Sequence, residues 1–202
     1  VAAPIALRSK VEEMIEVEIA NAKDGQPALI RAKFNSLADR RIIDKLYEAS
    51  QAGVPVELNV RGICCLRAGV KGLSERIRVV SIIDRFLEHA RIFYFMHGGN
   101  SRVFIASADW MGRNLDRRVE LMVPVLDQHC KTQVQRSLQS YFQDNVSSFE
   151  LQSDGGYRRL QPGTATAHRS QEDHYLTARE LYDEAQATSL TFRPARRSNE
   201  SA

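Results

Sequence analysis

Residues 28–60 read ALIRAKFNSLADRRIIDKLYEASQAGVPVELNV, and this stretch decides the fold class. Ala28–Lys33 is short and apolar and predicts a β-strand. Asp39–Ala52 predicts a helix, which ends at Gly53, a residue type that commonly terminates helices. Val54–Val60 predicts a second apolar strand, reached by a short turn. A strand, a helix and a strand in this order form a βαβ unit, which implies a parallel sheet with a right-handed crossover.

The segments on either side of this unit extend the sheet and add helices. Apolar residues near helical spacing predict a long amphipathic helix over Leu7–Ala22, and Asp24-Gly25 supplies its stop. The turn Gly98-Gly99-Asn100 predicts a strand hairpin over Arg91–Ala106. Further strands are expected near Ile77–Val80 and over Arg118–Val125, Val146–Leu151 and Tyr157–Leu160, a loop over Arg67–Arg76, and helices over Gln128–Asp144 and Gln171–Ala187. We therefore expect an α/β fold: a mixed sheet flanked by helices, with a C-terminal helix.

Length and composition set the remaining bounds. The chain has 202 residues and 43% hydrophobic content, enough for one domain over residues 1–190. The polar end predicts a disordered tail over 191–202. A net charge of +3 fits a polyanionic ligand but is too small to imply one. No apolar run is long enough to span a bilayer and no signal peptide is present, which favours the cytoplasm. The chain begins at Val1 without an initiator Met, so we expect an excised fragment.

The cysteines and most histidines do not form a recognisable metal or disulfide pattern. Cys64, Cys65 and Cys130 fit neither a disulfide framework nor a zinc site, so we expect buried thiols in a reducing compartment. His129, His168 and His174 lack metal-ligand spacing. No protein-held metal is therefore expected.

The hairpin carries the residues that say most about function. His89 and Arg91 are two positions apart and would share a face of a strand, and the hairpin would bring Ser107 and Asp109 back toward them. The guanidinium suits phosphate oxygens, the imidazole can move a proton near neutral pH, and the carboxylate can orient the imidazole. This combination predicts phosphoryl transfer.

Arginine and polar residues at nearby strand ends are further candidates. Arg61 ends a predicted central strand, where ligands of α/β sheets collect, and Gly62 would let a ligand approach the backbone. A surface arginine that caps a loop is an equally good explanation of Arg61 by position alone. Lys33 and Asn35 occupy an analogous strand end, and Lys33 would hold a phosphate.

A cluster of charged residues follows the hairpin: Arg113, Arg117, Arg118 and Glu120. Individually each is best explained as part of a solvated ion-pair face. As a group beside His89 they would line a channel for a linear polyanion. Alternation along a strand favours Arg118 and Glu120 for the site, and Arg117 for the opposite face. Trp110 is expected to pack in the core.

Three segments match one family in order: Arg61-Gly-Ile-Cys-Cys-Leu66, Ser81-Ile-Ile-Asp-Arg-Phe-Leu-Glu-His89, and Ser107-Ala-Asp-Trp-Met-Gly-Arg-Asn-Leu-Asp-Arg-Arg-Val-Glu120. Together they closely resemble the C-terminal catalytic domain of bacterial polyphosphate kinase, the histidine-phosphorylating type with two phospholipase-D-like domains. The resemblance runs from the start of the chain to about Leu160. It implies a phospholipase-D-like fold.

The resemblance also implies an activity and roles for two residues. The family moves the terminal phosphate of ATP reversibly onto polyphosphate, with Mg²⁺, through a phosphohistidine of the preceding domain. His89 falls on a second essential histidine, which contacts ATP and acts as acid or base, and Arg61 falls on an arginine that binds ATP phosphates. The phosphorylated-histidine motif is absent here, so His89 is expected to be half of a site.

The implied partners are ATP or ADP, polyphosphate, the preceding catalytic domain and, at full length, further copies of the chain. No nucleic acid is expected. Since no Walker-type glycine loop occurs, ATP binding would use arginines and backbone groups. A peripheral location at the inner membrane remains an alternative to a purely cytoplasmic one.

A comparison with phospholipase D leaves two alternatives open. Those enzymes pair two His-x-Lys segments, each followed by Gly-Ser-x-Asn. Here His89-Ala-Arg91 and Ser107-Ala-Asp109 occupy the second set, 18 positions apart (107 − 89), with Arg for Lys, Asp for Asn and Ala106 for Gly. The chain would be a phosphodiesterase only if a homodimer supplied the second set. It would otherwise be a phosphate-binding or oligomerisation module without catalysis.

Asp39-Arg40 departs from the family's Asp-Pro, so a shifted helix start is expected there.

Overall fold

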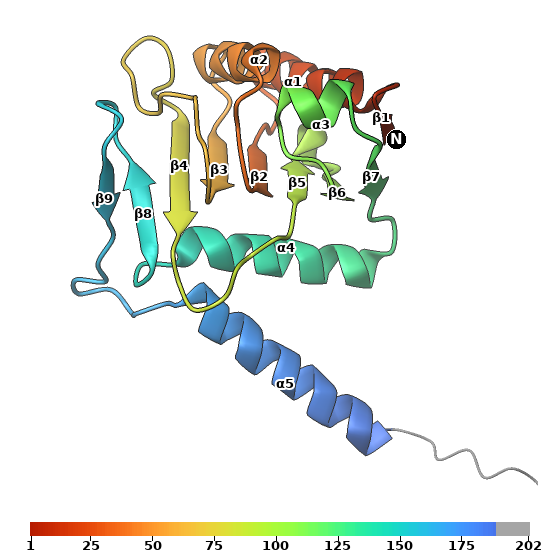
Figure 1. The fold of residues 1–202 in the computed structure, drawn as a ribbon, viewed down its shortest axis with the longest axis vertical. Helices are drawn as coiled ribbons and strands as arrows, with labels where there is room; N and C mark the ends of the chain where they lie inside the picture. The colour runs from red at the N-terminus through yellow and green to blue at the C-terminus, as the bar shows by residue number, and fades with distance from the viewer. Residues whose placement is uncertain (189–202) are drawn as a thin grey trace, which may run out of the picture.

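The computed structural model describes residues 1–188, so the tail predicted over 191–202 lies outside the described residues. The elements, in chain order, are β1 (Ala2–Ala3), α1 (Leu7–Lys23), β2 (Ile30–Phe34), α2 (Arg40–Gln51), β3 (Val56–Val60), β4 (Ile77–Ile82), β5 (Ile92–Phe95), a 3₁₀ turn η1 (His97–Gly99), β6 (Arg102–Ala106), α3 (Gly112–Asp116), β7 (Glu120–Pro124), α4 (Gln128–Gln143), β8 (Ser148–Leu151), β9 (Tyr157–Arg159) and α5 (Ser170–Thr188). The strands form one mixed sheet in the order β1-β7-β6-β5-β2-β3-β4-β8-β9. In Figure 1, α1 and α2 lie on one side of the strands and α4 lies on the other.

The centre of the sheet confirms the predicted βαβ unit. β2 pairs with β3, and β3 with β4, in parallel, whereas the remaining neighbours pair antiparallel. The hairpin β5–β6 is the one expected from the turn Gly98-Gly99-Asn100, and β8 and β9, both predicted as strands, pair as a second hairpin. The sequence pattern does not predict α3, because five residues are too few to show a helical period.

The start of α2 differs from the expected shift. Asp39 occupies the position before the first helical residue, Arg40, and its Oδ1 accepts a hydrogen bond from the backbone N–H of Ile42 at 3.1 Å. A carboxylate serves well in this position because it accepts from an otherwise unpaired N–H of the first turn. The helix therefore begins directly after Asp39, without a proline.

Apolar side chains fill both sides of the sheet. On the α1 and α2 side, Phe34, Phe93 and the fully buried Trp110 stack with ring centroids 4.6–6.2 Å apart. Trp110 is therefore a core residue, as predicted. On the other side, Leu138, Tyr141 and Phe142 of α4 form a second cluster with buried residues of β4, β5 and β6.

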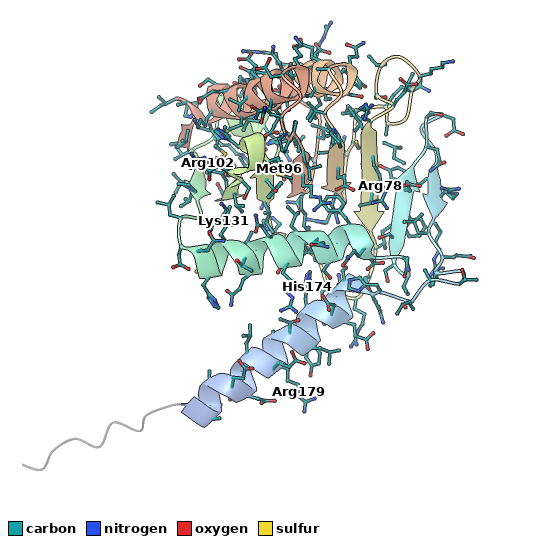
Figure 2. The ribbon with its side chains drawn as sticks, turned by 180° about the vertical axis from the view of Figure 1, so that it is seen from behind. Arg78, Met96, Arg102, Lys131, His174 and Arg179 are labelled. Atoms are coloured by element: carbon teal, nitrogen blue, oxygen red, sulfur yellow. The ribbon has the colours of Figure 1, made fainter. Side chains whose placement is uncertain are left out.

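The C-terminal helix α5 leaves the body of the molecule at an angle (Figures 1 and 2). At its start, Ser170 donates from both its backbone N–H and its hydroxyl to Asp144 Oδ2, at 2.8 and 2.9 Å. The His174 ring packs edge-on against Tyr141 at 4.7 Å. Arg179 lies on the part of α5 that points away in Figure 2, and these contacts anchor the first turns of the helix.

The expectation of buried thiols is wrong for two of the three cysteines. Cys64 is half-buried, but Cys65 and Cys130 are exposed, and all three are free. Cys65 lies in the loop after β3, and Cys130 lies in the exposed first turn of α4, so neither position faces a core. Among residues 1–188, no helix combines the length and the apolar character needed to span a bilayer.

Candidate active site

An open cleft of about 640 Å³ lies at the end of the sheet where β2 and β3 terminate and β5 begins. Its lining residues are Asn35, Ser36, Arg61, His89, Arg91, Ser107, Asp109, Arg113, Asn114, Arg118 and Glu120. We call it the active-site cleft. It contains every site residue predicted from the sequence except Lys33. Ser36 and Asn114 were not predicted, since each is an ordinary polar residue in a loop or short helix.

Asp109 orients Arg91 and not His89, contrary to the sequence-based expectation. Arg91 Nε lies 3.0 Å from Asp109 Oδ1, and both side chains are about nine-tenths buried. The same Oδ1 accepts from the backbone N–H of Asn35 at 2.8 Å. A guanidinium whose N–H groups donate to a carboxylate is held in a fixed plane. The orientation of Arg91 is therefore set by the protein before any ligand arrives.

His89 is exposed and contacts Arg91. Arg91 Nη1 lies 3.1 Å from His89 Nδ1 and also donates to the His89 carbonyl at 3.1 Å. Since a guanidinium only donates, Nδ1 acts as the acceptor, which leaves the proton of a neutral ring on Nε2. The Nε2–H group is then available to a ligand. His89 precedes β5 and is not on a strand, so this contact, not strand alternation, brings the two side chains together.

Asn35 links Arg61 to the same network. Arg61 Nε donates to Asn35 Oδ1 at 2.8 Å, and Arg61 has no ion pair among the described residues. Gly62 lets the chain pack closely: a Cβ there would lie 2.8 Å from the Asn35 carbonyl oxygen, which accepts from the Gly62 N–H at 2.7 Å. Its expected role in letting a ligand approach the backbone stays a prediction. The outer nitrogens of Arg61 remain free for an anion.

Glu120 holds two neighbouring polar side chains of the cleft. Its carboxylate accepts from the Ser107 hydroxyl and, at 2.6 Å, from Asn114 Nδ2. The Ser107 hydroxyl oxygen also accepts from the Leu121 N–H at 3.0 Å. These contacts join β6, α3 and β7 at the cleft, and they leave Glu120 with no free oxygen.

The lining is electropositive. Four arginines, Arg61, Arg91, Arg113 and Arg118, face two carboxylates, Asp109 and Glu120, so the formal charge is +2 with His89 neutral. Among the described residues, Arg113 and Arg118 have no ion pair. Arg118 precedes β7 and is not in the strand, yet it lines the cleft together with Glu120 as expected, and Arg117 does not.

Lys33 lies outside the active-site cleft. Its side chain is fully buried, with Nζ 3.2 Å from Glu88 Oε2 and 4.9 Å from the centroid of the Tyr141 ring. Burial lowers the pKa of Lys33, and the charge of Glu88 opposes that effect. Glu88 therefore pairs with Lys33 and not with the neighbouring His89. Lys33 therefore anchors the segment next to His89 and does not face a phosphate.

The start of α5 holds the same segment. Gln171 accepts from the Phe86 N–H and donates to the Phe86 carbonyl and to Glu88 Oε1, each at 2.9 Å. Arg169 forms a two-bond ion pair with Asp84, which lowers the pKa of Asp84 to about 2. These partners lie more than 80 positions apart, so no local pattern predicts them.

The donors present do not fit a Mg²⁺ ion held by this chain. Magnesium prefers free carboxylate oxygens and water, whereas Asp109 is paired with Arg91, and Glu120 is occupied by Ser107 and Asn114. Within residues 1–188, no group of three His, Cys, Asp or Glu side chains has the geometry to hold a metal.

Comparison with known proteins agrees with this geometry. The family model described as "Polyphosphate kinase C-terminal domain 2" matches residues 1–171. The chain belongs to the polyphosphate kinase family. It is 56% identical over 160 residues to a polyphosphate kinase of Rhodopirellula baltica, covering 79% of this chain and 19% of that protein. It is 49% identical over 181 residues to one of Thermosynechococcus vestitus, covering 90% and 25%.

Solved structures give the fold of this polyphosphate kinase domain. The crystal structure of polyphosphate kinase from Porphyromonas gingivalis superposes with a TM-score of 0.86 at 36% identity, covering 93% of this chain and 28% of that one. Nuc from Salmonella typhimurium, a phospholipase D family member, superposes with a TM-score of 0.53 at 15% identity, covering 75% and 95%. The predicted phospholipase-D-like fold is confirmed. The chain spans only about a fifth to a quarter of the length of the Rhodopirellula and Thermosynechococcus proteins.

Proposed function

We propose that this chain forms one half of the active site of an ATP:polyphosphate phosphotransferase. The observation that carries the proposal is the active-site cleft, where Arg61, Arg91 and Arg118 surround His89 and both carboxylates are already occupied. Such a cleft favours an anion with several oxygens. The chain belongs to the polyphosphate kinase family, and this membership supports ATP and polyphosphate as the anions that bind in the cleft.

The residues of the cleft divide the work between binding and proton transfer. Arg61 and Arg118 bind phosphate oxygens, and Arg91, held by Asp109, fixes the ring of His89. The bond between the terminal phosphorus and the bridging oxygen of ATP breaks, and a phosphorus–nitrogen bond forms to a histidine outside this chain. ADP leaves, and a terminal oxygen of polyphosphate then takes the phosphoryl group. A neutral imidazole does not release its N–H proton, so His89 acts as the acid in its protonated form: as the phosphorus–oxygen bond breaks, the imidazolium gives its Nε2 proton to the departing oxygen of ADP and is left neutral.

Mg²⁺ is proposed to accompany ATP and to neutralise charge between its phosphates. Since the cleft offers no free carboxylate, its protein ligands would come from elsewhere in the full-length protein. A cytoplasmic location is proposed together with the activity, because ATP is the phosphate donor. No nucleic acid is proposed as a ligand.

The second half of the site is proposed to come from the preceding catalytic domain. Ile105, Leu121 and Val123 are 45–54% exposed and form a patch on β6 and β7, where Ile105 pairs with Val123. The same strands lead to Ser107 and begin at Glu120. Adjacent apolar side chains beside a cleft are typical of an interface. We propose that the preceding domain covers this patch, and that the full-length protein assembles as a homo-oligomer.

His89→Gln in the full-length protein tests the proposal. Glutamine keeps a hydrogen-bond donor but cannot transfer a proton, so ATP-dependent phosphorylation of the other histidine should slow by about 10²–10⁴-fold. Rapid-quench measurement of acid-labile phosphoprotein gives the rate. His129→Gln, at an exposed histidine of α4, is the matched control and should be normal. A near-normal rate for His89→Gln would assign His89 to binding alone.

A phospholipase-D-like phosphodiesterase is the second candidate, favoured by the likeness to Nuc. Two copies of His89 would then have to face each other across a homodimer. Hydrolysis of bis(p-nitrophenyl) phosphate by the 202-residue chain, lost in His89→Ala, would support that alternative. We expect no hydrolysis.

A further inference from the structure

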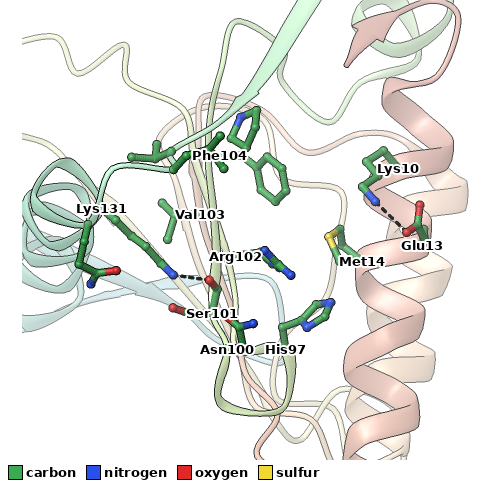
Figure 3. A pocket seen from close by; sticks show the side chains of 14 residues that line it. Lys10, Glu13, Met14, His97, Asn100, Ser101, Arg102, Val103, Phe104 and Lys131 are labelled. Carbon is green, nitrogen blue, oxygen red and sulfur yellow. Dashed lines mark hydrogen bonds and ion pairs between the residues drawn. The ribbon is translucent and has the colours of Figure 1, made fainter.

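A second basic hollow, which we call the rear cleft, lies at the other end of β5 and β6 (Figure 3). It has a volume of about 460 Å³ and lies between α1, the η1 turn and the start of α4. Arg102 at the start of β6 lines the rear cleft, and Ser107 just after β6 lines the active-site cleft. At about 3.4 Å per residue the two are roughly 17 Å apart, so the clefts are separate.

The rear cleft contains more positive charge than its own carboxylate neutralises. Its charged lining is Lys10, Arg102 and Lys131 against Glu13, a formal charge of +2 with His97 neutral. Lys10 pairs with Glu13 at 2.7 Å. Lys131 Nζ donates to the Ser101 carbonyl, which satisfies a donor without cancelling the charge. Arg102 has no ion pair among residues 1–188, and in Figure 3 it extends toward Met14 and His97.

The η1 turn that forms one wall is rigidly held. His97 has a φ of +51°, a conformation that costs free energy for a residue with a Cβ. Its N–H donates to Glu18 Oε1 at 2.6 Å, and Glu18 Oε2 accepts from the Leu29 N–H at 3.0 Å. Glu18 is fully buried, so a carboxyl group of the core holds the turn. The backbone of this wall is therefore fixed before a ligand binds.

We propose that the rear cleft binds inorganic polyphosphate at a point remote from the active-site cleft. The identity of the ligand rests on the proposed function, and the site itself rests on the unpaired Arg102 and its neighbours. A nucleotide fits less well, because the phenyl ring of the lining, Phe104, is only 6% exposed and packs edge-on against Phe95, so it offers no face to a base. A linear polyanion needs only repeated cations.

Amide NMR of the ¹⁵N-labelled 202-residue chain tests the inference. Tripolyphosphate, ATP and orthophosphate are titrated at constant ionic strength, because exposed charges are screened by salt. Tripolyphosphate should shift the amides of residues 97–102. Arg102→Glu should weaken that binding by about tenfold or more, the usual effect of losing a charge-assisted contact. Arg102→Gln removes the charge without reversing it, so it should weaken tripolyphosphate binding less. This variant replaces Arg102→Glu in the test if the glutamate variant has a low melting temperature.

The control is Arg76→Glu, at an exposed arginine without an ion pair in the described part of the chain. In this variant tripolyphosphate should still shift the amides of residues 97–102 as in the wild type. If Arg76→Glu weakens tripolyphosphate binding as much as Arg102→Glu does, the effect comes from net charge alone, and the inference is overturned. The inference would also be overturned if tripolyphosphate did not shift the amide signals of residues 97–102, or if ATP shifted them to saturation and tripolyphosphate did not. If tripolyphosphate shifted the amides near Ser36 but not those of residues 97–102, binding at the rear cleft would be refuted and the proposed function would not. Binding at 97–102 by a protein whose full-length form shows no polyphosphate kinase activity would refute the proposed function alone.

Discussion

At the scale of single residues, the hydrogen bonds around His89 assign each polar group one task. Arg91 donates to His89 Nδ1, Asp109 fixes Arg91, and Asn35 joins Asp109 to Arg61. A ligand therefore meets arginines whose geometry is already set, which reduces the entropy lost on binding. Arg61 is the member of this chain of contacts with free outer nitrogens, so its contribution can be measured separately.

Arg61→Ala in the full-length protein should raise the apparent requirement for ATP and slow transfer without unfolding the domain. Loss of one charge-assisted phosphate contact should cost about 1.5–3 kcal/mol, which lowers kcat/KM by about 10- to 150-fold. Arg61→Lys should recover only part of this, because an ammonium cannot form a two-bond fork. Steady-state kinetics over a range of ATP concentrations, with Arg76→Ala as the control, gives both values. Wild-type kinetics at low ATP would show that Arg61 is structural.

At the scale of elements, the segment between β4 and β5 depends on β2, which precedes it in the chain, and on α5, which follows it. Lys33 in β2 pairs with Glu88, and Gln171 at the start of α5 binds Phe86 and Glu88. His89 is exposed, but the residue before it is held by these contacts. The position of His89 is therefore controlled by β2 and α5 as well as by the hairpin.

Gln171→Ala should release the segment that carries His89. Three hydrogen bonds are lost, and the partly buried Phe86 N–H loses its partner, at a cost of about 1–3 kcal/mol in unfolding free energy. We expect faster hydrogen exchange over residues 83–89 and a fall in kcat larger than any change in the KM for ATP. Gln51→Ala is the control, because Gln51 makes a similar bond to Gly72, outside the site. Faster exchange with an unchanged kcat would show that α5 stabilises the segment without positioning His89.

At the scale of the whole molecule, the proposed active site is one-sided. The active-site cleft has His89, which we propose as the proton-transferring group, and arginines, but the residues that line it include no second histidine to serve as nucleophile. The exposed patch on β6 and β7 lies next to it and lacks a covering layer within the described residues. These two features agree with a chain that spans about a fifth to a quarter of its relatives.

The isolated 202-residue chain should therefore bind phosphates without turnover. Incubation with labelled ATP and polyphosphate should give neither acid-labile phosphoprotein nor new polymer, because the phosphorus has no histidine nucleophile to attack it. The full-length protein under the same conditions is the positive control. Robust polymer synthesis by the chain alone would contradict the half-site interpretation.

Much of the fold and most of the site were predictable from local patterns. The βαβ unit over residues 28–60 and both hairpins follow from apolar periodicity and turn glycines, which act over a few residues. Nine of the eleven residues lining the active-site cleft were candidates from the sequence, because they follow strand ends or belong to the motif segments around the hairpin; Ser36 and Asn114 were not. The placement of His89 just before β5 and the short α3 were missed, since neither element boundaries nor single helical turns leave a clear period.

The sequence by itself determined which residues are available for phosphate chemistry: His89, Arg61, Arg91 and Arg118 at the ends of predictable strands. Only the tertiary structure decided what each of them contacts. It turned Asp109 toward Arg91 and placed Lys33 beneath the cleft against Glu88. The physical reason is the distance along the chain over which the interactions act. Secondary structure follows from interactions between near neighbours, whereas a buried charge must find its partner wherever the packed chain brings one, here 18 positions away for Asp109 and 55 for Lys33 (88 − 33).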